Sequence, residues 1–228
     1  MIQVIAEHPD FYIVNKPADV NFHDEGELGQ GFFNQAKESL PSDELYPVHR
    51  LDKMTSGLVI LAKSKASASS FQTLFSSHQI NKFYLAVSSQ KPKKKQGTIK
   101  GDMAKSRRGT YKLLRTLENP AITQFFSQSI GQGQRLYLLR PLSGKTHQIR
   151  VALSSIGAPI LGDNHYAKGA DKDSDRGYLH AYQLCFEWNG ELKHYMCPPT
   201  SGIHFLRDKS LEQLNVWQHP SQLPWPKT

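Results

Sequence analysis

The sequence predicts an α+β fold, with a mixed, largely antiparallel central sheet and flanking helices and loops. Short apolar and β-branched runs, typical of strands, recur along most of the 228 residues. Turn-forming residues separate two pairs of these runs, as in antiparallel hairpins. Other segments repeat their apolar residues at helical spacing. Because 228 residues suit one large domain or a domain with a modest extension, we expect a single domain at residues 1–228, with residues 198–228 as a C-terminal extension packed on it.

The first part of the chain is expected to alternate strands and helices. The run Leu58–Ala62 is apolar and β-branched, which is typical of a buried strand, and Gly57 permits a tight turn just before it. Phe71 and Phe75 recur at helical spacing in a segment that begins near Lys65. The complete expectation is strands at residues 4–5, 11–14, 58–62 and 83–87, and helices at about 33–40 and from about 65.

The second part is expected to hold two hairpins and one helix. Gly131-Gln132-Gly133-Gln134 and Asn189-Gly190 are turn sequences that join neighbouring strands. Apolar residues recur at helical spacing from about Thr146 to Gly157, a suitable end for a helix, and Arg150 lies off this apolar stripe. The expected strands are residues 111–117, 123–130, 135–140, 178–188 and 192–196.

Composition restricts the class of protein. A hydrophobic fraction of 38% is typical of a globular chain. No apolar run approaches the roughly 18 residues of a membrane span, and the first residues lack the order of a secretory signal, so we expect a cytoplasmic protein without membrane contact. Neither the two cysteines, Cys185 and Cys197, nor the histidines have the spacing of a zinc site, and no metal is expected. A monomer is the default expectation.

The net charge of +8 is concentrated in one segment. Residues 91–115 hold ten Lys and Arg against one acidic residue, a net +9, whereas the rest of the chain has 18 basic and 19 acidic residues, a net −1. Localised positive charge favours a polyanion such as RNA, because Lys and Arg release counterions from phosphates. The alternative is a solvated loop that only raises solubility.

Three short segments concentrate chemically capable side chains beside apolar runs: residues 49–57, 82–84 and 143–150. Taken singly, each has an ordinary explanation. Asp52 fits a turn former ahead of a strand. Tyr84 fits the core or rim of a sheet, and Arg150 fits the surface of a helix.

In combination, these segments resemble the RluA-like pseudouridine synthases. The most specific part is His49-Arg50-Leu51-Asp52, followed by Thr55-Ser56-Gly57-Leu58. The other matches, in family order, are Val14-Asn15-Lys16-Pro17 with His23, Leu61-Ala62-Lys63, Lys82-Phe83-Tyr84-Leu85-Ala86, residues 144–151, residues 159–163 with Tyr166, and Leu179-His180-Ala181. Departures at Asp19, Ala152 and Ala167 do not touch the expected catalytic groups. Many relatives carry an N-terminal S4 RNA-binding module, whereas in this sequence the catalytic pattern begins almost at Met1, so we expect a stand-alone catalytic domain.

The resemblance implies the pseudouridine synthase catalytic fold and an isomerase that acts on RNA. Such an enzyme breaks the N1–C1′ bond of a specific uridine in ribosomal or transfer RNA, turns the uracil and joins C5 to C1′. Nothing enters or leaves overall, so no cofactor is implied. The uridine must be extruded from the folded RNA. Asp52 is implied as the central carboxylate, which acts on the sugar or on the base.

The resemblance also implies the rest of the site. Arg150 is expected to pair with Asp52 and hold it ionised. Tyr84 is expected to stack on the uracil or to accept the proton from C5. His49 and Arg50 adjoin the carboxylate and are candidates to contact the extruded nucleotide or to fill its place. The other expected RNA contacts are Lys82, Lys93, Lys94, Lys95, Lys105, Arg107, Arg108, Lys145 and His147.

Other classes fit the sequence less well. A protein kinase places its Asp directly after His-Arg and needs a Gly-rich phosphate loop, whereas Leu51 intervenes in this chain. A serine hydrolase would need a Gly-x-Ser-x-Gly elbow. The remaining alternative is a catalytically silent RNA-binding or RNA-chaperone protein on the same fold, and the intact Asp52, Tyr84 and Arg150 argue against it.

Overall fold

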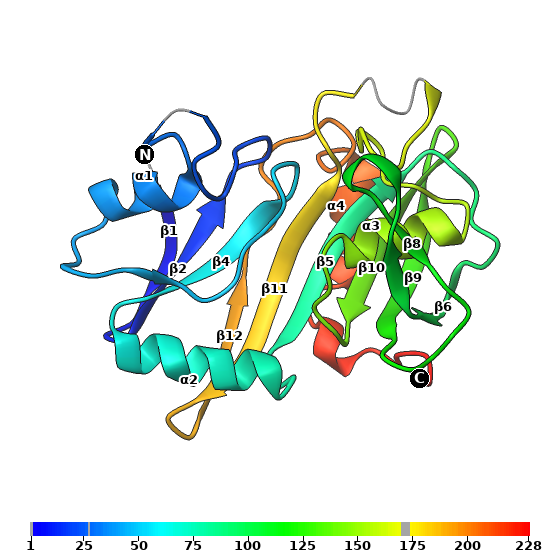
Figure 1. Cartoon of the computed structure of the whole chain (residues 1–228). Coiled ribbons are helices and arrows are strands. Elements are labelled where there is room, and N and C mark those ends of the chain that lie inside the picture. The colour runs from blue at the N-terminus through cyan, green and yellow to red at the C-terminus, as the bar shows by residue number, and fades with distance from the viewer. Residues whose placement is uncertain (1, 27, 170–173) are drawn as a thin grey trace. The chain divides into compact units, whose positions relative to one another are not determined.

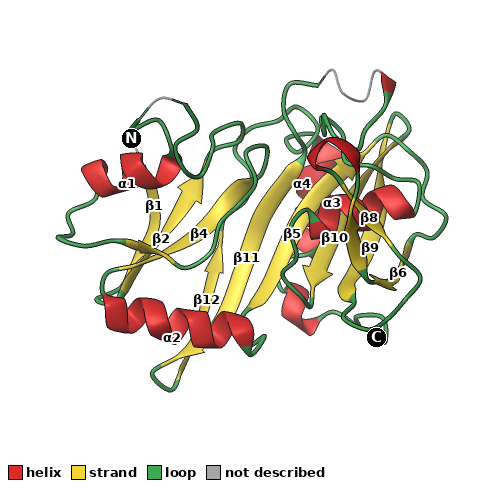
Figure 2. Ribbon diagram, viewed as in Figure 1, coloured by secondary structure: helices red, strands yellow, loops and turns green. Residues whose placement is uncertain are grey.

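The fold was obtained as a computed structural model that describes residues 2–26, 28–169 and 174–228. The chain divides into two compact units (Figure 1). The first unit comprises residues 1–82 and 180–198, and the second comprises residues 83–179 and 199–228. Each unit is built on antiparallel strands with helices against them (Figure 2), which confirms the predicted fold class.

The first unit is a sheet in the order β1-β2-β4-β11-β12, with β3 also paired to β4. Its strands are β1 (Gln3–Glu7), β2 (Phe11–Lys16), β3 (Tyr46–Pro47), β4 (Ser56–Ala62), β11 (Leu179–Trp188) and β12 (Glu191–Met196), and its helices are α1 (Phe32–Ser39) and α2 (Lys65–Ser76). Neighbouring strands run antiparallel, apart from the parallel pair β4 and β11.

Aromatic packing holds α2 on this sheet. The ring of Phe71 stacks on Trp188 at 4.3 Å and meets Phe11 edge-on at 5.2 Å. All three side chains are buried in one apolar cluster. Strand β4 is buried along its whole length, as its apolar sequence predicts, so the residues that precede it enter the unit at its core.

The second unit is a sheet in the order β5-β10-β9-β6, with a separate two-stranded hairpin β7–β8. Its strands are β5 (Asn81–Ser88), β6 (Gln96–Gly101), β7 (Met103–Lys105), β8 (Tyr111–Leu113), β9 (Ala121–Gly131) and β10 (Gln134–Pro141), and its helices are α3 (Gln148–Ser155) and α4 (Asp208–Val216). Short 3-10 turns occupy Arg107–Gly109 and Pro220–Gln222.

The two faces of the second sheet carry different partners. Tyr84 is paired with Leu139, which in turn is paired with Phe125, so these side chains share one face. Helix α3 lies on that face, because Gln148 bonds to Thr123, two residues from Phe125 on the same strand. The C-terminal segment covers the opposite face, where Trp225 contacts Phe83 and Phe126. Tyr84 and α3 therefore lie on the same side of the sheet.

Several predicted boundaries were wrong. Strand β8 ends at Leu113, four residues before the predicted end, because the N–H of Asp102 donates out of register to the carbonyl of Thr116 (2.9 Å) and breaks the ladder with β7. Strands β3, β6 and β7 and helix α4 were not predicted. Within residues 2–26, 28–169 and 174–228, no helix is both long enough and apolar enough to span a membrane.

Candidate active site

Asp52 lies half-buried in the loop between β3 and β4, residues 48–55, which we call the Asp52 loop. Its carbonyl accepts a bond from the N–H of Thr55 (3.0 Å), which closes a tight turn just before β4. The Asp52 loop therefore leads directly into a completely buried strand. The position of Asp52 depends on the bonds that hold this loop to the first unit.

Lys16 fastens the C-terminal half of the Asp52 loop. Its side chain is 0% exposed, and its Nζ donates to the carbonyls of Pro17 (2.8 Å), Lys53 (3.1 Å) and Thr55 (2.9 Å). A buried ammonium needs such acceptors, because burial without them is costly. Two of the three carbonyls follow Asp52 closely in the chain, so Lys16 fixes the backbone on its C-terminal side.

His49 fastens the N-terminal half. Its Nε2 accepts a bond from the N–H of Ile60 (2.9 Å), so the side chain completes the hydrogen bonding of β4 beyond the point where β11 pairs with it. The ring packs against Phe75 at 5.0 Å. Burial and then the nearby Lys82 lower the pKa of His49 to about 3. The neutral ring that this bond requires is therefore the stable form near neutral pH.

A buried polar chain secures the junction of the loop with β4. The hydroxyl of Ser56 lies 2.7 Å from Nδ1 of His180, and Nε2 of that ring lies 2.7 Å from the carbonyl oxygen of Cys197. Ser56 and His180 are also register partners in the parallel pair of β4 and β11. The start of β4 is thus tied to β11 by both backbone pairing and side chains.

Gly57 allows this close approach of β4 and β11. Its φ of +108° is one that L side chains rarely adopt, and a Cβ at this position would lie 2.2 Å from the carbonyl oxygen of Ala181. Only glycine fits without displacing backbone. The glycine that follows Asp52 in the motif is therefore required by the geometry of the strand junction.

Arg150 lies on α3 in the second unit and is 4% exposed, although it is off the apolar stripe. Its Nε and Nη2 bond to the two carboxylate oxygens of Asp163 at 2.7 and 2.8 Å. Asp163 is fully buried, and its Oδ1 also accepts from the N–H groups of His165 (2.9 Å) and Tyr166 (3.3 Å). A buried cation needs this compensation, and the fork holds the guanidinium in one orientation.

The start of α3 is fixed by side chains of the Gly144-Lys145-Thr146-His147-Gln148 segment. Gln148 accepts from the Ser143 hydroxyl (2.8 Å) and the Lys145 N–H (3.1 Å) and donates to the carbonyl of Ile122 (3.0 Å). His147 precedes the helix with a left-handed φ of 57°. Its Nδ1 lies 3.0 Å from the Tyr166 hydroxyl.

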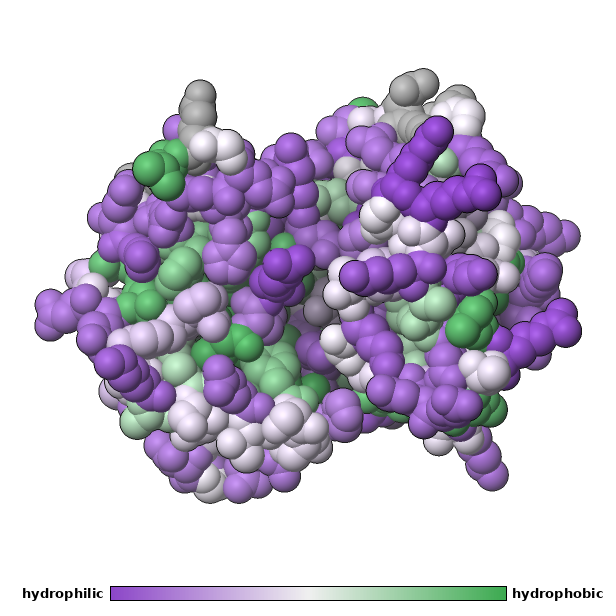
Figure 3. Space-filling view, in the orientation of Figure 1, coloured by the Kyte–Doolittle hydropathy of each residue, from purple (hydrophilic) through white to green (hydrophobic). Residues whose placement is uncertain are grey.

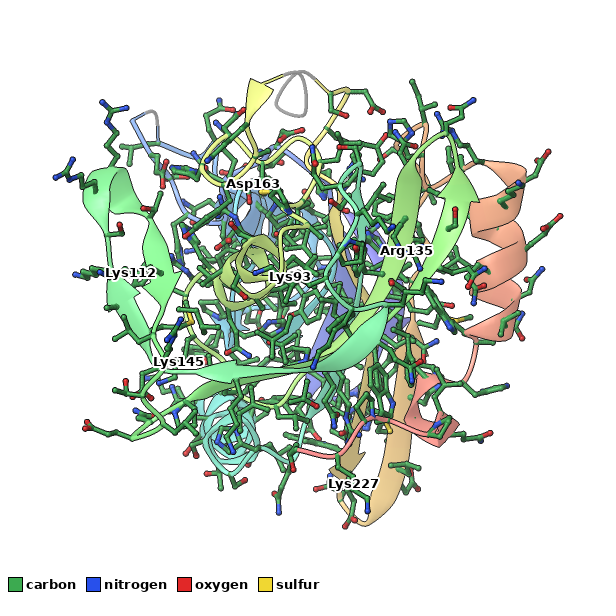
Figure 4. The ribbon with its side chains drawn as sticks, turned by 90° about the vertical axis from the view of Figure 1, so that its right-hand side faces the viewer. Lys93, Lys112, Arg135, Lys145, Asp163 and Lys227 are labelled. Carbon is green, nitrogen blue, oxygen red and sulfur yellow. The ribbon has the colours of Figure 1, made fainter. Side chains whose placement is uncertain are left out.

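The predicted RNA-binding lysines and arginines of the second unit lie largely in the solvent. Lys93, Lys94 and Lys95 are exposed ahead of β6. Lys105, Arg107 and Arg108 are exposed at the end of hairpin β7–β8, which also carries Lys112 (Figure 4). The visible surface of this unit is mainly hydrophilic (Figure 3). These positions are suited to contacts with phosphates.

The predicted site residues thus fall into two groups. Asp52, His49, Arg50 and Lys82 belong to the first unit, where Arg50 is exposed. Burial lowers the pKa of Lys82, whose Nζ lies 5.7 Å from the centre of the Phe75 ring. Tyr84, Arg150, Lys145, His147 and the basic segment belong to the second unit. The expected pairing of Arg150 with Asp52 stays a prediction.

The side chains that position these groups are not among the predicted site residues. Lys16, Asp163 and His180 lie inside the family motifs, and each is nearly or fully buried despite its polarity. A polar residue beside an apolar run was the available signal. In the described part of the chain, no three His, Cys, Asp or Glu side chains are grouped as a metal site would require.

Comparison with known proteins shows the family of this chain. The sequence model of a family described as RNA pseudouridylate synthase matches residues 10–155. A Haemophilus influenzae protein named uncharacterized RNA pseudouridine synthase is 47% identical over 216 residues, which cover 95% of this chain and 96% of that protein. A Rickettsia bellii protein named ribosomal large subunit pseudouridine synthase C is 33% identical over 190 residues, which cover 79% of this chain and 62% of that protein.

A solved structure gives the same result. The structure of human RNA Pseudouridylate Synthase Domain Containing 1 matches with a TM-score of 0.77 and 26% identity, and covers 100% of this chain and 97% of its own. The chain therefore belongs to the RNA pseudouridylate synthase family, in the RluA-like group that its motifs resemble. Proteins of this kind are isomerases.

Proposed function

We propose that the chain converts one specific uridine of ribosomal or transfer RNA to pseudouridine, with Asp52 as its central catalytic carboxylate. The observation that carries the proposal is the fastening of the Asp52 loop by Lys16, His49 and the Ser56–His180 pair. A catalytic carboxylate must be held in one geometry, because reorganisation during the reaction would raise the barrier. An ordinary turn former does not need three side-chain anchors.

The reaction needs an anion beside the sugar and the base. The N1–C1′ bond breaks, the uracil turns, and C5 joins C1′, after which C5 loses its proton and N1 gains one. Asp52 supplies the anion, and either covalent addition or electrostatic stabilisation uses its ionised form. Tyr84 then offers a ring for the uracil to stack on and a hydroxyl for the C5 proton.

Arg150 completes the proposed catalytic set. Asp163 holds its guanidinium in a fixed orientation, which suits a cation that must meet a carboxylate in one geometry. We expect Arg150 to favour the ionised form of Asp52. Retained single-turnover activity and RNA affinity in Arg150→Met would contradict this role.

Recognition of the RNA is divided between the target nucleotide and the backbone. The uridine must leave its stack, at a cost of a few kcal/mol, and the exposed Arg50 is the candidate to contact it or to fill its place. The basic residues of segment 91–115, together with Lys145, would bind phosphates without sequence preference. The name of the Rickettsia bellii relative makes large-subunit ribosomal RNA the first substrate to examine.

The test is chemical mapping of pseudouridine in total RNA from cells that lack this gene. One site should be lost and should return when the wild-type gene is supplied, but not when Asp52→Asn is supplied. An unchanged pseudouridine map in the deleted strain would contradict the proposed activity. A site restored by Asp52→Asn would contradict the role of the carboxylate.

The proposal includes a monomeric enzyme that works in the cytoplasm. Sedimentation of the purified protein with and without RNA tests the first part. A stable dimer in the absence of RNA would contradict it.

A further inference from the structure

Hairpin β7–β8 contacts the rest of the second unit through Tyr111, whose backbone N–H faces away from the hairpin. The N–H of Ser106 bonds to the carbonyl of Thr110 (2.8 Å), so the next pair, Lys105 and Tyr111, is a non-hydrogen-bonded pair of the ladder. The N–H of Tyr111 therefore points outward. It donates to the hydroxyl of Tyr166 at 2.8 Å.

Tyr166 is itself held against α3. Its N–H donates to Oδ1 of Asp163 at 3.3 Å. The same carboxylate accepts the two bonds from Arg150. The Arg150 guanidinium lies 5.1 Å from the centre of the Tyr166 ring. The hydroxyl also lies 3.0 Å from Nδ1 of His147, which precedes α3. The turn from Asp163 to Tyr166 thus fixes the hydroxyl relative to the helix that carries Arg150.

We propose that the Tyr166 hydroxyl is a positioning group that docks the basic hairpin β7–β8 beside α3. The Lys and Arg side chains of the hairpin and the start of α3 would then contact the RNA as one surface. The hairpin lies next to α3, and its end carries Lys105, Arg107 and Arg108 in the solvent. An undocked hairpin would spread these charges over many arrangements, and ordering them would then oppose binding. The inference rests on the proposed function.

The experiment uses Tyr166→Phe, which keeps the ring over Arg150 and removes only the hydroxyl. Tyr46→Phe is the matched control, because the Tyr46 hydroxyl bonds to the exposed Glu44 side chain, in the first unit and away from the hairpin. Amide hydrogen exchange at Tyr111 reports docking directly. KM and kcat are measured on RNA extracted from a strain that lacks this gene, and binding is measured with a labelled oligouridine.

We expect Tyr166→Phe to accelerate exchange at Tyr111 and to raise KM about fivefold, the effect of removing one hydrogen bond. The rate at saturating RNA should stay at the wild-type value, and Tyr46→Phe should match wild type throughout. Unchanged exchange would overturn the docking. Faster exchange with unchanged KM and oligouridine affinity would overturn its role in RNA binding.

The outcomes separate this inference from the proposed function. If the wild-type protein forms no pseudouridine in this RNA, the proposed function fails. Hydrogen exchange and oligouridine affinity still test the docking in that case. If the wild type is active and Tyr166→Phe keeps its KM, its affinity and its exchange rate, only the inference fails.

Discussion

Single polar side chains determine where Asp52 lies. Lys16 binds the carbonyls of Lys53 and Thr55 on one side of it, and His49 reaches Ile60 from the other. Each of these anchors is buried or bonded to buried backbone, where an unsatisfied polar group costs about 1–3 kcal/mol. Removal of one anchor would therefore affect stability as well as the position of the carboxylate.

His49 should make stability depend on pH. The pKa of His49 is about 3 in the folded protein and about 6.5 in an unfolded chain. Between these values the unfolded state binds more protons, so the free energy of unfolding falls as pH falls through this window. His49→Gln removes the titration and keeps an acceptor for Ile60. Urea unfolding at about pH 7 and about pH 5 should show a smaller loss for this variant than for wild type.

An equal loss of stability in His49→Gln and wild type would contradict a neutral His49. The comparison cancels the carboxylates that titrate in the same range, because they are the same in both proteins.

The sequence indicates which residues could act in catalysis, but it does not indicate which hydrogen-bond and ion-pair partners they have in the fold. The motifs predicted Asp52, Tyr84 and Arg150, and Arg150 proved to be buried, with Asp163 as a partner. That partner is thirteen positions away on another segment, and only tertiary packing brings the two together. The neutral anchor role of His49 was missed for the same reason, since it depends on the stretch of β4 beyond its pairing with β11.

At the scale of secondary-structure elements, close approaches and edge contacts of the backbone fix how neighbouring elements of one unit pack. At the junction of β4 with β11, the backbone of Gly57 approaches Ala181 more closely than any side chain permits. Hairpin β7–β8 forms a separate two-stranded sheet, and at its edge the N–H of Tyr111 donates to the hydroxyl of Tyr166.

Gly57→Ala should destabilise the protein far more than Gly133→Ala. Both glycines have positive φ, +108° and +75°, but a Cβ at Gly133 meets nothing within 4 Å. The Gly133 change should cost about 1–2 kcal/mol for the left-handed backbone alone, and the Gly57 change should cost about 3 kcal/mol or more because β4 must move away from β11. Denaturant midpoints give both values, and equal costs would contradict the close approach.

Neutralising the hairpin should flatten the salt dependence of RNA binding. In the triple variant Arg107→Gln, Arg108→Gln, Lys112→Gln, the slope of log affinity against log salt should decrease in magnitude by about 1 for each phosphate that is no longer neutralised. Lys209→Gln, an exposed site on α4, is the control and should keep the slope. A triple variant with the slope of wild type would show that the hairpin charge is only solubilising.

Most elements could be predicted, since hydrophobic periodicity is local. Strands β2, β4, β5, β9, β10 and β11 and helices α1, α2 and α3 lie close to their predicted positions. Strands β6 and β7 were missed, because their Lys, Gly and Thr residues carry no apolar run. Helix α4 was missed because its sequence follows a Pro-containing stretch and its apolar residues are sparse.

At the scale of the whole molecule, a single domain predicts that the two compact units unfold in one transition. The chain has three tryptophans, of which Trp188 lies in the first unit and Trp217 and Trp225 in the second. The variant Trp217→Phe, Trp225→Phe leaves a fluorescence signal from the first unit alone. For a single domain, its denaturant transition should coincide with that of the far-ultraviolet circular dichroism of the same variant. Two separate midpoints would show independent units.

The central claim is tested most directly by purified Asp52→Asn on RNA from a strain that lacks this gene. The substitution keeps the size of the side chain and removes its charge. We predict that wild type forms pseudouridine, whereas Asp52→Asn forms none while it binds the RNA and unfolds like wild type. Formation of pseudouridine by Asp52→Asn at a rate comparable with wild type would contradict a catalytic carboxylate at this position.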